Sequence, residues 1–180
     1  MPNSSARKER PLPDMKRRYR VILTVGVVIL VLDQLTKFWI QQAIPLWEKG
    51  FTVIPGFFDI VHIVNRGAAF GFLNRHDIDW QRPFFIVVTM IAMVFIAVLA
   101  RSKEDDGPFY VYGLGLILGG ALGNLLDRVR LGMVVDFLDF YVGTWHWPAF
   151  NVADIAICLG AAGLLVSFYQ HRGRRVSNHL

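Results

Sequence analysis

Long apolar runs alternate with shorter polar segments along this chain. Crossing a bilayer as a helix takes roughly 20 predominantly apolar residues. Four runs come close to that length, at residues 19–39, 84–100, 109–126 and 150–169. The pattern therefore predicts four transmembrane helices.

The segments between these runs form two outer regions, residues 41–83 and 127–149. Within the first, residues 51–65 are rich in Val, Ile, Phe and Thr but are broken by Pro55 and Gly56. Such a pattern is typical of short strands rather than of a membrane span. The second region is expected to be a polar loop. The fold class predicted is an all-α membrane protein with a small β element.

The two ends of the chain differ from the rest in composition. Residues 1–18 hold Pro, Ser and basic residues with little apolar content, which predicts a disordered tail. We expect a single integral-membrane domain over residues 19–170 and a second short tail over 171–180.

Composition and charge support a membrane protein and suggest its orientation. Hydrophobic residues make up 54% of the chain and charged residues only 18%, which is more apolar than a usual soluble domain. The net charge of +5 is concentrated at the ends, so both tails are expected in the cytoplasm. The connection 101–107 carries both positive and negative charges, so it adds little support for this orientation. Seven of the nineteen basic residues lie at or before Arg20, namely Arg7, Lys8, Arg10, Lys16, Arg17, Arg18 and Arg20.

Other functional classes receive little support. The basic tail has no interleaved aromatic residues and leads straight into a membrane segment, so nucleic-acid binding is not expected. Cys158 is the single cysteine and cannot form an intrachain disulfide. The five histidines show no metal-ligand spacing, so no metal or other cofactor is expected.

Conspicuous polar residues converge at one end of the predicted bundle. With both tails in the cytoplasm, the first and third spans end at the outer face and the fourth begins there. This puts Asp33 in the same interfacial slab as Asp154. Asp136 and Asn65 are placed in outer loops beside them. Ionisable groups at such a position are costly and suggest function. The third span contributes Asn124, Asp127 and Arg128 to this slab, and the fourth contributes Asn151.

Each of these residues also has a structural interpretation. Asn151 and Asp154 have the spacing of a capping box at a helix start. Asp33 and Lys37 are an i,i+4 pair that can satisfy each other.

The remaining acids also have simple structural explanations. Asp127 is expected to pair with its neighbour Arg128 and so close the third span. Asp139 is expected to be an exposed loop residue. These readings do not explain why so many acids share one low-dielectric slab.

Close carboxylates suggest a definite chemistry. Two carboxylates held together cannot both ionise cheaply, so one keeps a proton near neutral pH. The ionised partner then takes a proton from water, and the protonated one polarises a scissile carbonyl. Ser167 and Cys158 lie deeper in the fourth span and offer no competing nucleophile–histidine pair.

Five ordered blocks of sequence carry a family resemblance. The chain resembles the bacterial lipoprotein signal peptidases (type II signal peptidases, a family of aspartic peptidases) from about residue 20 to residue 170. The blocks are Asp33-Gln34-Leu35-Thr36-Lys37, Asn65-Arg66-Gly67-Ala68-Ala69-Phe70, Gly119 to Arg128, Val134-Val135-Asp136-Phe137 and Phe150-Asn151-Val152-Ala153-Asp154.

The resemblance implies roles for individual residues. Asp136 and Asp154 correspond to the catalytic aspartates of the family. Substrate binding or structural support is implied for Asn65, Gly67, Asn124, Arg128, Asn151, Asp33 and Lys37.

The resemblance also implies an architecture and a reaction. Four transmembrane helices would carry a small periplasmic β-cradle at residues 44–64 and a short interfacial helix at about 68–76. The reaction is removal of signal peptides from prolipoproteins, by cleavage on the N-terminal side of a diacylglyceryl-modified cysteine. It needs no cofactor.

A location and a set of partners are implied as well. The protein is expected in the bacterial cytoplasmic (inner) membrane, with its active site at the outer, periplasmic face. The expected partners are diacylglyceryl-modified prolipoproteins, membrane lipids and globomycin-type inhibitors, and the protein is expected to be a monomer.

Two other membrane activities receive less support from the sequence. A phosphotransferase of the CDP-alcohol type gathers acids around a divalent metal, and Gly132 with Asp136 and Asp139 faintly echoes its motif. However, Asp139 comes one residue too early and the upstream part of the motif is missing. A proton-coupled transporter would need acids forming a path across the membrane, whereas these acids lie at one face.

Overall fold

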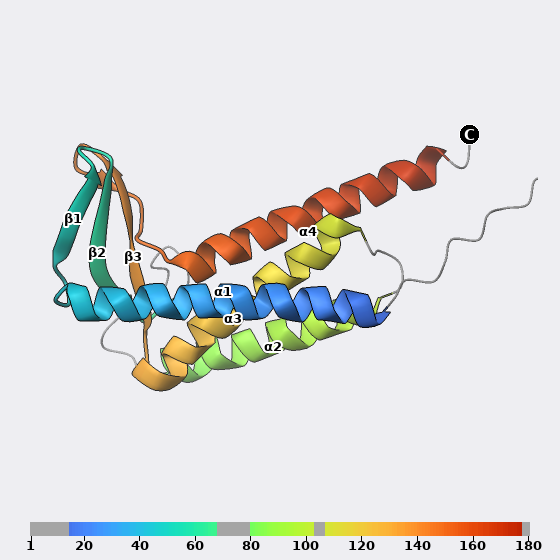
Figure 1. The fold of residues 1–180 in the computed structure, drawn as a ribbon, viewed down its shortest axis with the longest axis horizontal. Coiled ribbons are helices and arrows are strands. Elements are labelled where there is room, and N and C mark those ends of the chain that lie inside the picture. Colours follow the sequence, from blue (N-terminus) through green and yellow to red (C-terminus); the bar gives the residue numbers. More distant parts are fainter. Residues whose placement is uncertain (1–14, 68–79, 103–106, 178–180) are drawn as a thin grey trace, which may run out of the picture.

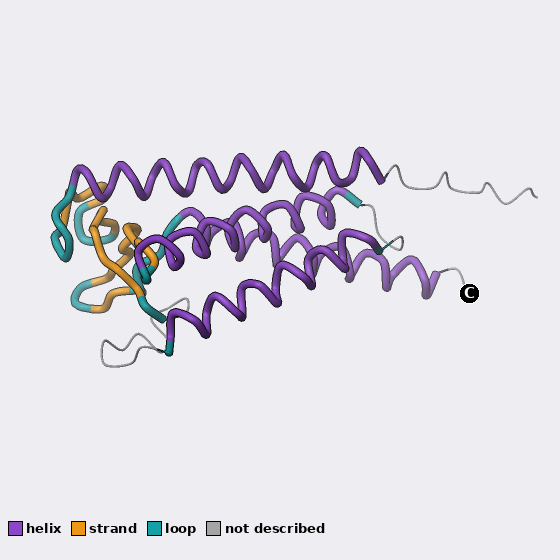
Figure 2. Tube along the Cα trace, turned by 90° about the horizontal axis from the view of Figure 1, so that it is seen from below, coloured by secondary structure: helices purple, strands orange, loops and turns teal. Residues whose placement is uncertain are grey.

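The part of the chain that the structure describes consists of four long helices and one small sheet. The computed structural model describes residues 15–67, 80–102 and 107–177, with side chains up to residue 170. The helices lie side by side, and the sheet sits at one end of them (Figures 1 and 2). This confirms the predicted fold class. The helices are α1 (Met15–Ala43), α2 (Gln81–Arg101), α3 (Pro108–Leu131) and α4 (Val152–Ser177).

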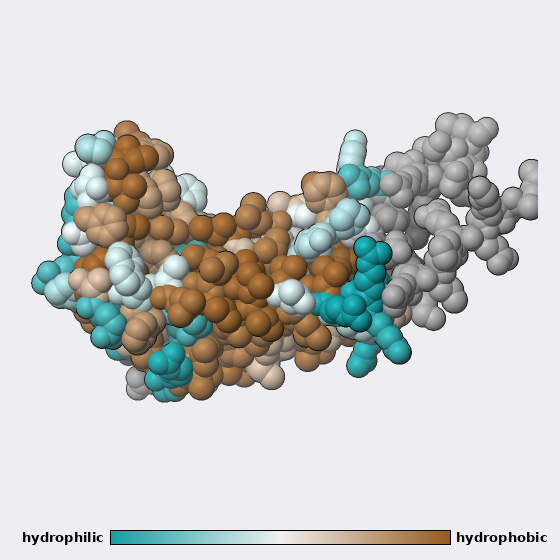
Figure 3. Space-filling model, in the orientation of Figure 1, coloured by the Kyte–Doolittle hydropathy of each residue, from teal (hydrophilic) through white to brown (hydrophobic). Residues whose placement is uncertain are grey.

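Each helix is longer than the apolar run that predicted it. All four are long and apolar enough to cross a membrane. Much of their apolar surface faces outward, and Leu35, Ile91 and Leu165 are each more than 60% exposed. Figure 3 shows a broad hydrophobic surface over the face of the helices that is in view. Exposed apolar surface of this extent marks a contact with a membrane or another protein, and on four helices long enough to cross a bilayer it is the surface expected to face lipid.

Helix α3 is the centre of the bundle, and glycines bring its neighbours close. A side chain at Gly119 would collide with the Gly26 carbonyl of α1, and one at Gly120 with the Ala153 carbonyl of α4. Small residues allow such close approach of membrane helices. The polar ends of α1, α3 and α4 are thereby held within hydrogen-bonding range of one another.

The sheet is antiparallel and contains four strands in the order β1-β2-β3-β4. The β-cradle was expected at residues 44–64. Strands β1 and β2 lie in that range, except that β2 extends one residue beyond it. The expected interfacial helix at residues 68–76 falls outside the described residues. The strands are β1 (Lys49–Ile54), β2 (Phe58–Asn65), β3 (Val134–Val142) and β4 (Trp145–His146).

The prediction of a polar loop over residues 127–149 was wrong. Helix α3 continues to Leu131, and β3 then pairs with β2. The strand forms because Val135 and Phe137 pack against Ile40 and Ile44 near the end of α1. The signal for this strand was the enrichment of residues 134–142 in Val, Phe and Tyr, which favour strands.

Asp136 and Asn65 were accordingly misplaced in loops. Asp136 lies within β3, and Asn65 is the last residue of β2, paired with Val134. Both side chains therefore project from a hydrogen-bonded sheet, which holds them more firmly than a loop.

Candidate active site

The predicted convergence of polar residues is present in the structure. The C-terminal parts of α1 and α3, the beginning of α4 and the sheet meet at one end of the molecule (Figure 1). Many of the polar side chains there are buried, including Asp33, Lys37, Asn65, Asn124, Asp127, Arg128, Asp136 and Asn151.

The Lys37 ammonium group is at the centre of this cluster and is only 1% exposed. It lies 2.9 Å from Asp33 Oδ2 and 2.8 Å from Asp127 Oδ2, and it donates to Asn124 Oδ1 at 2.8 Å. An ammonium group has three N–H donors, so all three are satisfied. The expected Asp33–Lys37 pair is present, but it is one part of a network that joins α1 to α3.

Asp33 extends the network to α4. Its Oδ1 accepts a hydrogen bond of 2.9 Å from the backbone N–H of Ala153, in the first turn of α4. A side chain at Gly123 would overlap the Asp33 carboxylate, so only glycine leaves room for it. A carboxylate at a helix start also satisfies a backbone donor that the helix itself leaves free.

Asp127 does not form the predicted pair with Arg128 but is bound to Lys37. Its carboxylate also accepts hydrogen bonds from Gln34 Nε2 at 3.0 Å and from the backbone N–H of Val135 at 3.3 Å. Adjacent residues on a helix point in different directions, about 100° apart, which explains why the neighbouring pair does not form. Asp127 thus links two helices to the strand that carries Asp136.

Arg128 points toward the segment that follows β2. It donates to the Gly67 carbonyl at 3.1 Å and lies over the Phe85 ring at 5.2 Å. The backbone N–H of Gly67 in turn donates to Asn65 Oδ1 at 2.8 Å. Arg128, Gly67 and Asn65 therefore belong to one connected group beside the acids.

Two asparagines hold Asp136 and Asp154. Asn151 Nδ2 donates to Asp136 Oδ1 at 2.7 Å, and Asn124 Nδ2 donates to Asp154 Oδ1 at 2.9 Å. The two amides also contact each other, with Asn151 Nδ2 at 3.3 Å from Asn124 Oδ1. A continuous chain of side chains therefore joins the two carboxyl groups.

The predicted capping box at the start of α4 is also present. Asn151 Oδ1 accepts from the Asp154 N–H at 3.0 Å, and Asp154 Oδ2 accepts from the Asn151 N–H at 3.3 Å. Asp154 therefore has a structural role and also contacts the cluster through Asn124. The two interpretations of this residue are compatible rather than exclusive.

Burial changes the acidity of Asp136, which is 3% exposed. Removal from water, reinforced by the nearby Asp154 carboxylate, raises the pKa of Asp136 to about 7, although hydrogen bonds from Asn151 and Asn65 oppose the rise. This carboxyl group is therefore readily protonated near neutral pH. That is the behaviour expected of a pair of acids with one proton between them.

Asp139 is not the exposed loop residue that was predicted. It is 7% exposed, and its carboxylate lies 2.9 Å from His146 Nδ1. It lies three residues after Asp136 in β3, and successive side chains alternate between the faces of a strand. Asp139 therefore projects from the opposite face of the sheet, away from the cluster.

Gln34 was not predicted as a site residue. Its amide contacts both acids that pair with Lys37, since Nε2 lies 3.2 Å from Asp33 Oδ2 and 3.0 Å from Asp127 Oδ1. Its position between Asp33 and Lys37 in sequence was the available signal.

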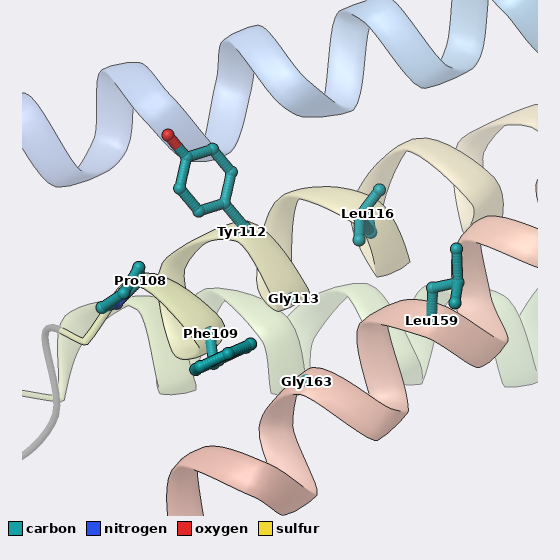
Figure 4. Close-up of a pocket in the computed structure, with 7 residues that line it drawn as sticks. All are labelled: Pro108, Phe109, Tyr112, Gly113, Leu116, Leu159 and Gly163. Carbon is teal, nitrogen blue, oxygen red and sulfur yellow. The ribbon is translucent and has the colours of Figure 1, made fainter.

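An apolar cleft of about 240 Å³ lies far from this cluster, between α3 and α4. It is near the opposite end of α3, and Figure 4 shows Gly113 and Gly163 facing each other there. Its lining is apolar apart from Tyr112, which provides no group for acid–base chemistry. Within the described residues, no three His, Cys, Asp or Glu side chains are grouped to hold a metal ion.

Comparison with known proteins identifies the family. The model of the family described as signal peptidase (SPase) II matches residues 25–170. The chain belongs to the signal peptidase II family. A relative named lipoprotein signal peptidase, from Maridesulfovibrio salexigens, is 57% identical over 86% of this chain and 99% of its own length. Another of that name, from Geobacter metallireducens, is 48% identical over 89% of this chain and 98% of its own.

Solved structures of relatives agree with the fold. A bacterial membrane enzyme determined at 2.3 Å resolution by the in meso method has a TM-score of 0.75 and 28% identity, and covers 86% of this chain and 91% of its own. A second, determined at 1.9 Å, has a TM-score of 0.71 and 30% identity, covering 83% and 92%. This signal peptidase II is therefore a multi-pass membrane protein, and the match favours neither the phosphotransferase nor the transporter alternative.

The Lys37 network leads to a stability prediction. Replacing Lys37 with Gln removes the cation that neutralises Asp33 and Asp127 in a buried position. Breaking a buried ion pair by removing one partner costs roughly 3–5 kcal/mol. We expect a loss of that order in the free energy of unfolding, measured by denaturation in detergent micelles.

Lys49→Gln is the matched control. Lys49 also pairs with an aspartate, Asp59, at 2.7 Å, but its side chain is 52% exposed. Its loss should therefore cost much less. Equal destabilisation by the two substitutions would contradict the central role of Lys37.

Proposed function

We propose that this signal peptidase II removes signal peptides from prolipoproteins, by cleaving the peptide bond on the N-terminal side of a diacylglyceryl-modified cysteine. The observation that carries the proposal is the pair of aspartates, Asp136 and Asp154, joined through Asn151 and Asn124. Family membership supplies the substrate class, and the acid pair supplies the chemistry.

The two aspartates have different surroundings, which suggests their roles. Asp136 is almost fully buried and readily protonated, so it is proposed as the proton donor to the scissile carbonyl oxygen. Asp154 is partly exposed and accepts hydrogen bonds from two N–H donors, which stabilise its ionised form. It is proposed as the general base that activates water.

The reaction then follows in two steps. Water attacks the carbonyl carbon while Asp154 takes a proton from that water and Asp136 gives its proton to the carbonyl oxygen. In the tetrahedral intermediate, the C–N bond breaks as Asp154 returns its proton to the leaving nitrogen. Asp136 regains a proton from the hydroxyl group as the carbonyl reforms. The enzyme ends in its starting protonation state.

The other cluster residues are proposed to support this pair. Lys37 fixes the orientation of the Asn124 amide by binding its Oδ1, so that Nδ2 points toward Asp154. Arg128 anchors Gly67 beside Asn65, and these groups are proposed to contact substrate. Asp33 orients the first turn of α4, from which Asp154 projects.

The location of the acids suits a lipid-anchored substrate. They belong to the end of the molecule where the apolar helices meet the sheet (Figure 1), and the end of a membrane-spanning helix lies close to a membrane boundary. A cysteine held by two acyl chains would present its neighbouring peptide bond at that depth. We propose that this boundary is the periplasmic face of the bacterial inner membrane.

The proposed orientation places both termini in the cytoplasm. It is supported by the basic residues at the start of α1, including Lys16, Arg17 and Arg20, at the end opposite the acids. A cysteine introduced at Ser5 of the Cys158→Ala protein should resist a membrane-impermeant thiol reagent in intact cells, and one at Thr144 should react. Reaction at Ser5 but not at Thr144 would mean that the orientation is reversed.

Three further properties are proposed from family membership. The enzyme acts as a monomer, it contacts membrane lipids along the exposed helices, and globomycin-type antibiotics bind at the aspartate pair. Inhibition in the cleavage assay below and light scattering of the purified protein would test the antibiotic and the oligomeric state.

Removing either carboxylate should abolish catalysis. We expect Asp136→Asn and Asp154→Asn each to reduce the cleavage rate by roughly 10²–10⁴-fold or more, because each removes a proton-transfer step. Cleavage is measured with a lipidated precursor and the purified variants, by the mobility shift on a gel.

Asp139→Asn is the matched control, since it changes an acid on the other face of the same strand. It should retain near wild-type activity. Full activity of Asp136→Asn or Asp154→Asn would remove that residue from the mechanism, and loss of activity in Asp139→Asn would mean that the acid pair is misassigned.

The raised pKa of Asp136 predicts the pH dependence of cleavage. Above a pH of about 7, this group loses the proton that it donates to the carbonyl oxygen. The value of kcat/KM should then fall, approaching tenfold for each further pH unit. A rate that stays constant from pH 7 to pH 9 would argue against Asp136 as the proton donor.

A further inference from the structure

The sheet extends beyond the helices on one side. In Figure 1 its strands run across the ends of the helices, and the far end rises clear of α4. We call this part the free end of the sheet. It contains the β1–β2 turn with Phe57 and the β3–β4 turn between Val142 and Trp145.

At its base, β3 contacts α1 through Val135 and Phe137 on one face and the beginning of α4 on the other face. The face toward α4 continues onto the free end. Asp136 identifies this face, because its side chain bonds to Asn151 at the beginning of α4. Side chains two residues apart share a face of a strand. Phe140 and Val142 of β3 thus lie on the same face as Asp136, farther out along the strand.

This face is apolar and rich in aromatic residues. Phe140 stacks on Phe58 of β2 at 4.4 Å between ring centroids and on Phe150 at 5.7 Å. A cleft of about 320 Å³ at this end of the sheet is lined by Phe57, Val142, Trp145 and Trp147, together with Tyr141 from the edge of the opposite face. Val142 is 66% exposed and Trp145 is 61% exposed.

The opposite face carries two acids, each bonded to a basic residue. Asp59 and Asp139 are direct partners across β2 and β3, and each has its own basic neighbour. Asp59 Oδ2 lies 2.7 Å from Lys49 Nζ, and Asp139 Oδ2 lies 2.9 Å from His146 Nδ1. Burial raises the pKa of Asp59, but hydrogen bonds from Lys49 and Thr52 outweigh it and hold that pKa below its usual value.

The free end is therefore amphipathic in the way that suits a membrane surface. We propose that its aromatic face lies in the headgroup region of the lipid leaflet that borders the active site, while the charged face remains in water. Trp and aromatic residues favour this depth of a bilayer. In Figure 3 hydrophobic surface continues from the helices onto the sheet, and all four helices are long and apolar enough to cross a membrane.

The consequence for the site is geometric. If the free end of the sheet rests on the leaflet, β3 is held at a fixed depth. Asp136, on the same face of β3, is then held at a set depth relative to the lipid headgroups. This inference requires membrane-spanning helices but does not depend on the proposed reaction.

The test compares the two faces with a fluorescent label. Val142→Cys on the aromatic face and Thr52→Cys on the charged face are each made in the Cys158→Ala protein and labelled with an environment-sensitive thiol probe. The proteins are reconstituted in phosphatidylethanolamine–phosphatidylglycerol vesicles. Quenching is measured with lipids carrying a nitroxide near the headgroup and, separately, with aqueous iodide.

We expect the ratio of nitroxide to iodide quenching to be several-fold higher at position 142 than at position 52, with blue-shifted emission at 142. Trp145→Cys provides a second label on the aromatic face, and a single symmetric peak in size-exclusion chromatography shows that each labelled protein is folded. Equal iodide access at positions 142 and 52 would overturn the proposal. So would protection of 142 from both quenchers, since protein rather than lipid would then cover this face.

Discussion

The buried Lys37 ammonium group is the interaction on which the rest of this structure depends. Its three donors are taken up by two carboxylates and one amide, from α1 and α3. Those partners in turn hold the first turn of α4 and the backbone of β3. An unpaired charge in this position would be very costly. The cation therefore specifies one arrangement of the elements that carry Asp136 and Asp154.

Close helix packing makes this arrangement possible. Gly119 and Gly120, neighbours in α3, face α1 and α4 respectively, and a larger residue at either position would push a neighbouring helix away. Bonds of about 2.8–3.3 Å leave no tolerance for such a shift. Apolar packing in the middle of the bundle thus sets the helix separation that the hydrogen bonds at its end require.

The two faces of the sheet place their side chains in different surroundings. On one face of β3, Asp136 meets the asparagine chain, and the aromatic residues farther along extend outward from it. On the other face, Asp139 pairs with His146. The alternation of a strand places two acids only three residues apart in different environments, and it also makes the sheet amphipathic beyond the helices.

The sequence by itself determined the four helices, the residues that gather at one end and the family, because apolar length, charge distribution and the five motifs are local properties of the chain. It also contained the Asp33–Lys37 pair and the capping box, which depend on fixed helical spacing. Only the tertiary structure decided that Asp127 binds Lys37 rather than Arg128, that Asp139 is buried and that Asp136 lies on a strand. Those outcomes depend on which distant elements pack together, and local spacing does not encode that.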